Sequence, residues 1–308
     1  MNAATRVAYG EALVELAAQN PDVVVLDADL AGATKTGGFK KAAPERFFDM
    51  GISEGDMVGT AAGLALCGKI PFATSFAVFA TGRAFEQVRN SVCYPNLNVK
   101  ICGTHAGPSC GEDGGTHQSV ADIAVMRALP NMTVVVPADD VEARAATIAA
   151  ADYVGPMYLR YSRLASPTIH AEDYEFQLGR GELLREGDDL SIIACGQMVA
   201  EALEAADVLA ANGVFARVVN MHTVKPLDEE LVLECARKTG RIVTVEEGTV
   251  VGGLGSAVCE LLSEKLPVPV RRIGVADHFG KSGEGRALMR EFGLSAEHIV
   301  EVGLELVK

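Results

Sequence analysis

Residues 46–76 read RFFDMGISEGDMVGTAAGLALCGKIPFATSF, and this stretch decides the fold class. Two short apolar runs, 46–52 and 70–76, have the length of buried strands, and the small apolar residues of 54–68 between them have the length of a helix. A strand, a helix and a second strand in this order predict a parallel α/β sheet, because parallel strands need a long crossover connection. An acid, Glu54, stands where the first strand gives way to the helix.

The same alternation continues on both sides of this unit. Further strands are expected at 22–28, 97–103, 132–138 and 156–162, with helices at 5–20, 82–94 and 139–153. The pattern resumes with strands at 190–196, 215–221, 241–248 and 269–275 and helices at 197–213, 228–240 and 255–266. We therefore expect an α/β protein of two domains, each a mostly parallel sheet flanked by helices. The first domain covers 1–165, a polar linker with a short hairpin-like entry into the next domain covers 166–186, and the second domain covers 187–308.

Composition excludes several classes of function. The chain has 308 residues, a net charge of −14 and a pI near 4.9, which argues against a nucleic-acid surface because phosphate backbones need clustered Lys and Arg. No run approaches the roughly 18–20 apolar residues of a membrane span, and the N-terminus lacks the layout of a signal peptide. We expect a soluble, cytoplasmic protein that binds no membrane. Its seven cysteines include no CxxC pair, so we expect reduced core residues.

The loop 103–119, GTHAGPSCGEDGGTHQS, is the second informative stretch. It follows a predicted strand, and the carboxyl ends of parallel strands are where α/β sheets bind ligands. His105, Asp113 and His117 lie within it beside five glycines, which would let the backbone approach a ligand closely. A polar surface turn is the plain alternative. A zinc site is a second one, but the spacing matches no common ligand pattern, so we expect no metal ligand here.

The motifs in these two stretches resemble those of transketolases. GEDGGTHQS is similar to the family's GEDGPTHQ-type signature, and the block 50–79 is similar to the one around its catalytic glutamate. TVVVPADDVEA and YLRYSR follow in the family's order. The resemblance covers most of the chain and implies the pyrimidine-binding and C-terminal domains of an enzyme that uses thiamine diphosphate.

One motif of the family is missing. Transketolases hold the diphosphate and Mg²⁺ through a Gly-Asp-Gly triplet in another domain, and no such triplet occurs in this sequence. The resemblance therefore implies the C-terminal subunit of a split transketolase, with thiamine diphosphate and Mg²⁺ held mainly by a partner. The expected assembly is a homodimer of these domains with N-terminal transketolase subunits attached, a heterotetramer.

The resemblance also assigns roles around the cofactor. Glu54 would hydrogen-bond the aminopyrimidine from an apolar slot, where desolvation favours a carboxyl group that shares a proton near neutral pH. An acid stabilised by the helix dipole behind an N-capping Ser53 is the alternative. Phe76 and Phe79 would wall the pyrimidine ring, unless they are ordinary core residues. Asp29 would reach the cofactor across the dimer, unless it caps a turn.

The substrates would be sugar phosphates, between which a two-carbon ketol unit is transferred from a ketose phosphate to an aldose phosphate. The resemblance implies that His105 and His117 contact the substrate oxygens, with imidazoles suited to move protons near pH 7, and that Asp113 lies near the hydroxyl groups. Arg163 and Arg6 would hold the substrate phosphate, unless they form surface ion pairs.

Departures from the family pattern leave the substrates open. Gly115 and Ser119 replace residues that are usually Pro or Ala and Pro, and Ala33 or Thr34 occupies the position of a phosphate-contacting Ser. Arg83 and Gln87 receive no role because the spacing shifts there. The rival enzymes are a 1-deoxyxylulose-5-phosphate-synthase-like protein and a β subunit of a 2-oxo-acid dehydrogenase. A non-catalytic dimeric scaffold is the alternative from another class.

Overall fold

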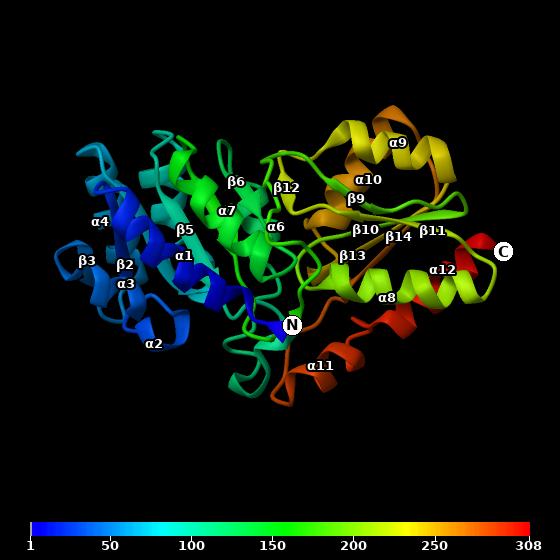
Figure 1. Ribbon diagram of the computed structural model, residues 1–308, viewed down its shortest axis with the longest axis horizontal. Coiled ribbons are helices and arrows are strands. Elements are labelled where there is room, and N and C mark those ends of the chain that lie inside the picture. The colour runs from blue at the N-terminus through cyan, green and yellow to red at the C-terminus, as the bar shows by residue number, and fades with distance from the viewer. Residues whose placement is uncertain (1) are drawn as a thin grey trace.

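The computed structural model describes residues 2–308. It contains two α/β units side by side, each a β-sheet flanked by helices (Figure 1). The first sheet has the strand order β12-β6-β7-β5-β4-β2-β3, in which β2 to β7 are mutually parallel. These strands are β2 (Val23–Asp27), β3 (Phe47–Asp49), β4 (Ile70–Phe76), β5 (Lys100–Thr104), β6 (Thr133–Val135) and β7 (Met157–Arg160). The predicted fold class is confirmed.

Helices cover both faces of this sheet because both faces of its strands are apolar. In β2, Val23 and Val25 join one hydrophobic cluster, whereas Val24 and Leu26 join another on the opposite face. The first cluster lies under α1 (Thr5–Gln19), α3 (Gly37–Ala42) and α7 (Asp140–Asp152). The second lies under α4 (Glu54–Leu66), α6 (Asp122–Arg127) and the helical segment 79–93.

The second sheet has the strand order β14-β13-β10-β11-β9, with only β9 antiparallel. Its strands are β9 (Glu182–Arg185), β10 (Leu190–Ala194), β11 (Ala216–Asn220), β13 (Ile242–Thr249) and β14 (Val270–Val275). The flanking helices are α8 (Met198–Ala211), α9 (Glu229–Thr239), α10 (Leu254–Lys265) and α12 (Ala296–Val307). Leu190 and Ile192 pack with residues of α8 and α12, whereas Ile193 packs in the cluster that includes α9 and α10.

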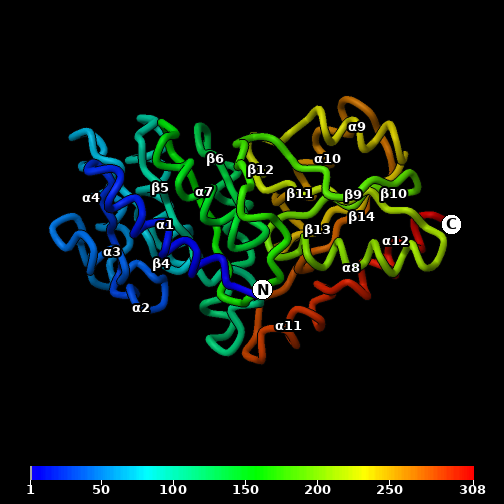
Figure 2. Tube along the Cα trace, in the orientation of Figure 1, coloured from blue at the N-terminus to red at the C-terminus, as the bar shows by residue number. Residues whose placement is uncertain are grey.

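The two sheets are joined by more than one connection. After β11 the chain leaves the second sheet, and the next strand, β12 (Thr223–Lys225), pairs antiparallel with β6 of the first sheet. The segment predicted as a linker contains two strands. Strand β8 (Ser166–Pro167) pairs with β1 (Asn2–Ala3) in a separate two-stranded sheet, and β9 of the second sheet begins at Glu182. One hydrophobic cluster runs without a break from the first sheet into the second. Figure 2 shows the N-terminus at the junction of the sheets and the C-terminus at the outer end of the second.

Two local expectations differ from the structure. The helix expected at 82–94 is divided into η2 (Phe79–Arg83) and η3 (Val88–Cys93), both with π-helical turns, separated by α5 (Phe85–Gln87). Widened turns of this kind re-aim side chains and are frequent at functional sites. All seven cysteines are free as expected, but Cys67 is exposed because it caps the end of α4, where the chain turns back into solvent. Within residues 2–308, no helix is long and apolar enough to cross a membrane.

Candidate active site

The predicted site residues gather at the carboxyl edge of the first sheet. Glu54 follows β3, Phe76 ends β4, His105 follows β5 and Arg163 follows β7. These strands are parallel and close in the sheet, so the segments that leave them meet on one side of it.

Glu54 is the first residue of α4, and its side chain is only 1% exposed. Ser75 donates its hydroxyl to Oε1 at 3.3 Å, and Arg83 donates from Nη1 to Oε2 at 2.6 Å. We expected an apolar slot around Glu54, but the slot also contains two polar groups, the hydroxyl of Ser75 and the guanidinium of Arg83. Arg83 reaches the carboxylate from the π-helical turn of η2. Ser53 is the N-cap residue but makes no side-chain capping bond, whereas Glu54 lies in the first turn of α4, where the helix dipole also favours an acid.

An aromatic wall stands at the same edge of the sheet. The ring of Phe76 stacks on the imidazole of His105 with centroids 3.9 Å apart and is nearly parallel to Phe79 at 6.2 Å. His117 meets the ring of Phe79 edge-on at 5.3 Å. The guanidinium of Arg83 lies 4.6 Å from the centre of Phe79. Both predicted aromatic residues and both predicted histidines thus belong to one cluster, and Arg83 joins it to Glu54.

His105 is held as a neutral imidazole. Arg6 can only donate, so its bond of 2.9 Å to Nε2 leaves the ring proton on Nδ1, which faces Thr104 Oγ1 at 2.8 Å. Burial, followed by the charges of Arg6 and Arg163, lowers the pKa of His105 to about 3. In the chain alone, burial and the neighbouring arginine charges disfavour a second positive charge at this site, so the role of His105 in moving protons near pH 7 stays a prediction.

Two arginines line a neighbouring cavity of about 230 Å³, together with residues 109–112, 164–165 and 284–285. Arg163 donates to the carbonyl of Cys110 at 2.8 Å and to Asp113 Oδ2 at 3.0 Å. Arg6 also donates to the carbonyl of Ala33 at 2.7 Å, and burial, followed by the charge of Arg163, lowers its pKa. The two guanidinium groups face a cavity whose lining also contains Glu112 and Glu284, so a phosphate group would be bound by the arginine N–H donors and not by a net positive charge.

Asp29 lies apart from this cluster within one chain. It is exposed, has a positive φ of 60°, and its backbone N–H donates to Asp49 Oδ1 at 3.2 Å. Among residues 2–308, its carboxylate makes no hydrogen bond or ion pair with the other predicted site residues. Thr34 is buried and donates to Asp27 Oδ2 at 2.8 Å, so its hydroxyl is already committed within the chain.

The glycine-rich loop is fastened to the second sheet by Glu247 of β13. Its Oε1 accepts the backbone N–H of Ser109 at 2.8 Å, and its Oε2 accepts Gln197 Nε2 at 2.5 Å. Arg160 donates to the Glu247 carbonyl at 2.5 Å and forms an ion pair with its carboxylate at 3.6 Å. A Cβ atom on Gly107 would lie 2.2 Å from Glu247 Oε1. We expected the glycines of this loop to let a ligand approach the backbone. Gly107 instead makes room for the side chain of Glu247.

The comparisons with known proteins agree with this arrangement. Residues 1–168 match the family model "Transketolase, pyrimidine binding domain", and residues 179–299 match "Transketolase, C-terminal domain". The chain belongs to the transketolase family. Transketolases depend on thiamine diphosphate.

Relatives in this family differ in length. A putative transketolase C-terminal section of Methanocaldococcus jannaschii is 47% identical over 306 residues, covering 98% of this transketolase chain and 96% of that protein. A 1-deoxy-D-xylulose-5-phosphate synthase of Geobacter sulfurreducens is 42% identical over 94% of this chain but only 46% of its own length. A solved structure described as "Split gene transketolase, inactive beta4 tetramer" is 54% identical, with a TM-score of 0.93 over 99% of this chain and 98% of that one.

Proposed function

We propose that this chain is the C-terminal subunit of a split transketolase, which transfers a two-carbon ketol unit from a ketose phosphate to an aldose phosphate. The observation that carries the proposal is the buried carboxylate of Glu54 beside the aromatic wall of Phe76 and Phe79, in a chain that lacks a Gly-Asp-Gly triplet. The first feature suits one half of the cofactor, and the missing triplet is what we expect if a partner subunit holds the other half.

The pyrimidine half of thiamine diphosphate fits the residues at the sheet edge. Each oxygen of the buried Glu54 carboxylate accepts one hydrogen bond from the chain and can accept a second from a ring nitrogen, and the aromatic rings beside it offer a stacking surface. Glu54 would hold a proton shared with a ring nitrogen, and Ser75 and Arg83 would orient its two oxygens. The cofactor, when bound, supplies the nucleophilic carbon that accepts the two-carbon unit.

The remaining predicted residues would bind the sugar phosphate. Arg6 and Arg163 would hold the phosphate group in the cavity that both line. Neutral His105 would hydrogen-bond a substrate oxygen without changing charge, whereas His117, which is only half-buried, would approach the substrate from the aromatic wall. Asp113, oriented by Arg163, would lie near the hydroxyl groups, and Asp29 would serve the neighbouring protomer.

The proposed assembly includes a partner subunit. The diphosphate and Mg²⁺ would be held mainly by an N-terminal partner subunit, and two copies of each chain would form a heterotetramer, which we expect in the cytoplasm. A related split-gene protein is described as inactive in a tetramer of its β chains, which supports a need for the partner.

The test compares the chain alone with the chain and a partner that carries a Gly-Asp-Gly triplet. We expect no tight cofactor binding when the isolated chain is titrated with thiamine diphosphate and Mg²⁺, and ketol transfer between sugar phosphates once the partner is added. Stoichiometric binding by the isolated chain would contradict the split-subunit proposal. Release of CO₂ from pyruvate by the assembled enzyme would favour the 1-deoxyxylulose-5-phosphate-synthase-like or dehydrogenase alternatives.

A further inference from the structure

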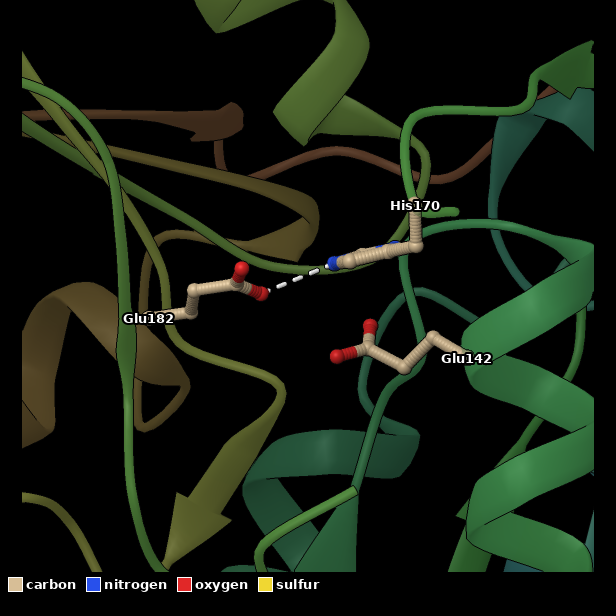
Figure 3. A group of neighbouring side chains, drawn as sticks. All are labelled: Glu142, His170 and Glu182. Carbon is tan, nitrogen blue, oxygen red and sulfur yellow. Dashed lines mark hydrogen bonds and ion pairs between the residues drawn. The ribbon is translucent and has the colours of Figure 1, made fainter. Parts of the chain in front are cut away.

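Three side chains from separate segments converge at the junction of the two sheets, outside the candidate active site (Figure 3). Glu142 comes from the first turn of α7, His170 from the segment between β8 and β9, and Glu182 from the start of β9. One nitrogen or oxygen atom of each lies within 4.8 Å of the others. Glu142 and His170 are buried, and Glu182 is half-buried.

The imidazole of His170 is oriented as in many metal sites. Its Nδ1 faces Asp139 Oδ2 at 2.9 Å, and its Nε2 faces Glu182 Oε2 at 2.9 Å. A carboxylate on the far nitrogen is the arrangement that fixes the ring of a metal-binding histidine and makes the other nitrogen a better ligand. Because both nitrogens face carboxylates at hydrogen-bond distance, each carries a proton unless a cation replaces the one on Nε2.

Negative charge is in excess at this point. Asp139, Glu142 and Glu182 surround the ring, and among residues 2–308 no Lys or Arg forms an ion pair with any of them. Asp139 and Glu142 are fully buried, where an unbalanced charge is costly. One imidazolium would neutralise only part of this charge, whereas a divalent cation would neutralise more of it.

A buried amide gives an independent sign of a missing partner. Asn220 is 0% exposed and donates its Nδ2 to Glu142 Oε1 at 2.9 Å, so the amide lies at this cluster. Its Oδ1 is a buried acceptor without a hydrogen-bond partner among the described residues. A water molecule bound beside this amide would supply the donor that the oxygen lacks.

The surroundings meet the other requirements of a metal site. A cavity of about 360 Å³, lined by residues 174–175, 177, 180–183 and by His222, leads from solvent to Glu182. Glu142 is oriented by the backbone N–H of Ala138 at 2.7 Å and by the hydroxyl of Tyr174 at 2.8 Å. Ligands of a tetrahedral zinc ion lie roughly 3.3 Å apart, which falls between the 2.9 Å from Nε2 to Oε2 of Glu182 and the 4.8 Å within which all three ligand atoms lie, so binding needs small side-chain shifts.

We propose that Glu142, His170 and Glu182 bind one zinc ion, with water in the fourth position, and that this ion fastens α7, the segment after β8 and β9 to one another. Zn²⁺ accepts both imidazole nitrogen and carboxylate oxygen as ligands, and the imidazole favours it over Mg²⁺ and Ca²⁺, which prefer oxygen ligands alone. The ion would join segments of the two sheets, and none of its ligands is among the residues assigned to the sugar phosphate.

The experiment uses the untagged full chain with Cys67→Ser, because an exposed thiol would also bind zinc. After chelation and gel filtration, Zn²⁺ is titrated in competition with a chromophoric chelator. We expect one ion per chain and a rise in Tm of at least about 4 °C at a hundredfold excess over the dissociation constant. With Co²⁺ we expect a spectrum of nitrogen and oxygen ligands without thiolate absorption.

Matched variants decide whether these residues are the ligands. Glu182→Gln and His170→Asn should each weaken zinc binding by at least about tenfold. His298→Asn should not, although it also removes a His–Glu pair, the exposed one between His298 and Glu301. Because Glu182 is half-buried and His170 is buried, Glu182→Gln should fold even if His170→Asn does not, and it can then decide the test alone. No binding by the parent chain, or equal binding in all variants, would overturn the proposal and leave a proton-bridged ion pair. The outcome does not depend on the partner subunit or on activity.

Discussion

Arg83 donates a hydrogen bond of 2.6 Å to Glu54, and the pair joins a side chain that is 49% exposed to one that is 1% exposed. The guanidinium also lies over the ring of Phe79. One cation thus links the buried carboxylate to the aromatic wall, so that the orientation of Glu54 depends on a residue in the π-helical turn of η2.

Glu54→Gln should abolish most of the turnover of the assembled enzyme while leaving the fold intact. The amide can still accept from Arg83 and donate to Ser75, but it cannot exchange a proton, so kcat should fall by about 10²–10⁴-fold. Steady-state kinetics and thermal unfolding give the two readouts. Asp56→Asn, an exposed acid in the same helical turn, is the control and should keep its activity. Near-normal kcat in Glu54→Gln would refute the assigned role.

Arg83→Met should lower stability modestly. The variant keeps the length of the side chain but leaves Glu54 with Ser75 as its hydrogen-bond donor. Because Arg83 is half exposed, solvent screening limits the loss to about 1 kcal/mol, or about 2–4 °C in Tm. Arg89→Met, which removes an exposed arginine bonded to Asn90, should leave Tm unchanged. Equal Tm values for the two variants would show that the pair with Glu54 contributes no net stability.

His105 should make the chain less stable in acid. Its folded-state pKa is lowered to about 3, whereas an unfolded histidine titrates near 6.5. Between these two values the unfolded chain binds a proton that the folded chain does not, so stability is complete above about pH 6.5 and falls as pH decreases toward 3.

Thermal unfolding between pH 7.5 and 5 provides the measurement for His105. His105→Asn should lose less Tm over this interval than the parent chain, whereas His278→Asn, at an exposed histidine, should follow the parent. In NMR spectra, the ring signals of His105 should stay constant over the same interval. A midpoint near pH 6.5 in those signals would contradict the neutral imidazole.

Glu247→Ala should destabilise the junction between the glycine-rich loop and the second sheet. It removes the acceptor for Ser109 and Gln197 and leaves the buried guanidinium of Arg160 without one of its carboxylate partners. Breaking a buried pair in this way costs about 3–5 kcal/mol, which urea unfolding measures.

Two further variants make the test of Glu247 specific. Glu247→Gln keeps an acceptor for Ser109 and should cost less than the alanine variant. Glu264→Ala, at an exposed acid of α10, should change the free energy of unfolding by no more than about 0.5 kcal/mol. If Glu247→Ala matched Glu264→Ala, the carboxylate would not hold the loop.

The architecture could be predicted because it depends on local periodicity. The strand predicted at 70–76 is β4, and the helices predicted at 5–20 and 139–153 differ from α1 and α7 by one residue or two. Strand pairing between the two sheets was missed, because β12 has only three residues and no period. The helix at 82–94 has a helical pattern, but its widened turns depend on what packs against it.

The sequence by itself determined the alternation of strands and helices, the edge of the sheet at which Glu54, Phe76 and His105 gather, and the resemblance to one family. These properties depend on residues that are close along the chain. Only the tertiary structure decided that Arg83 pairs with Glu54, that Glu247 holds the glycine-rich loop from 138 residues away, and that His105 is neutral. Burial and charge at a side chain depend on atoms from distant segments, and periodicity along a chain does not specify which of those atoms meet.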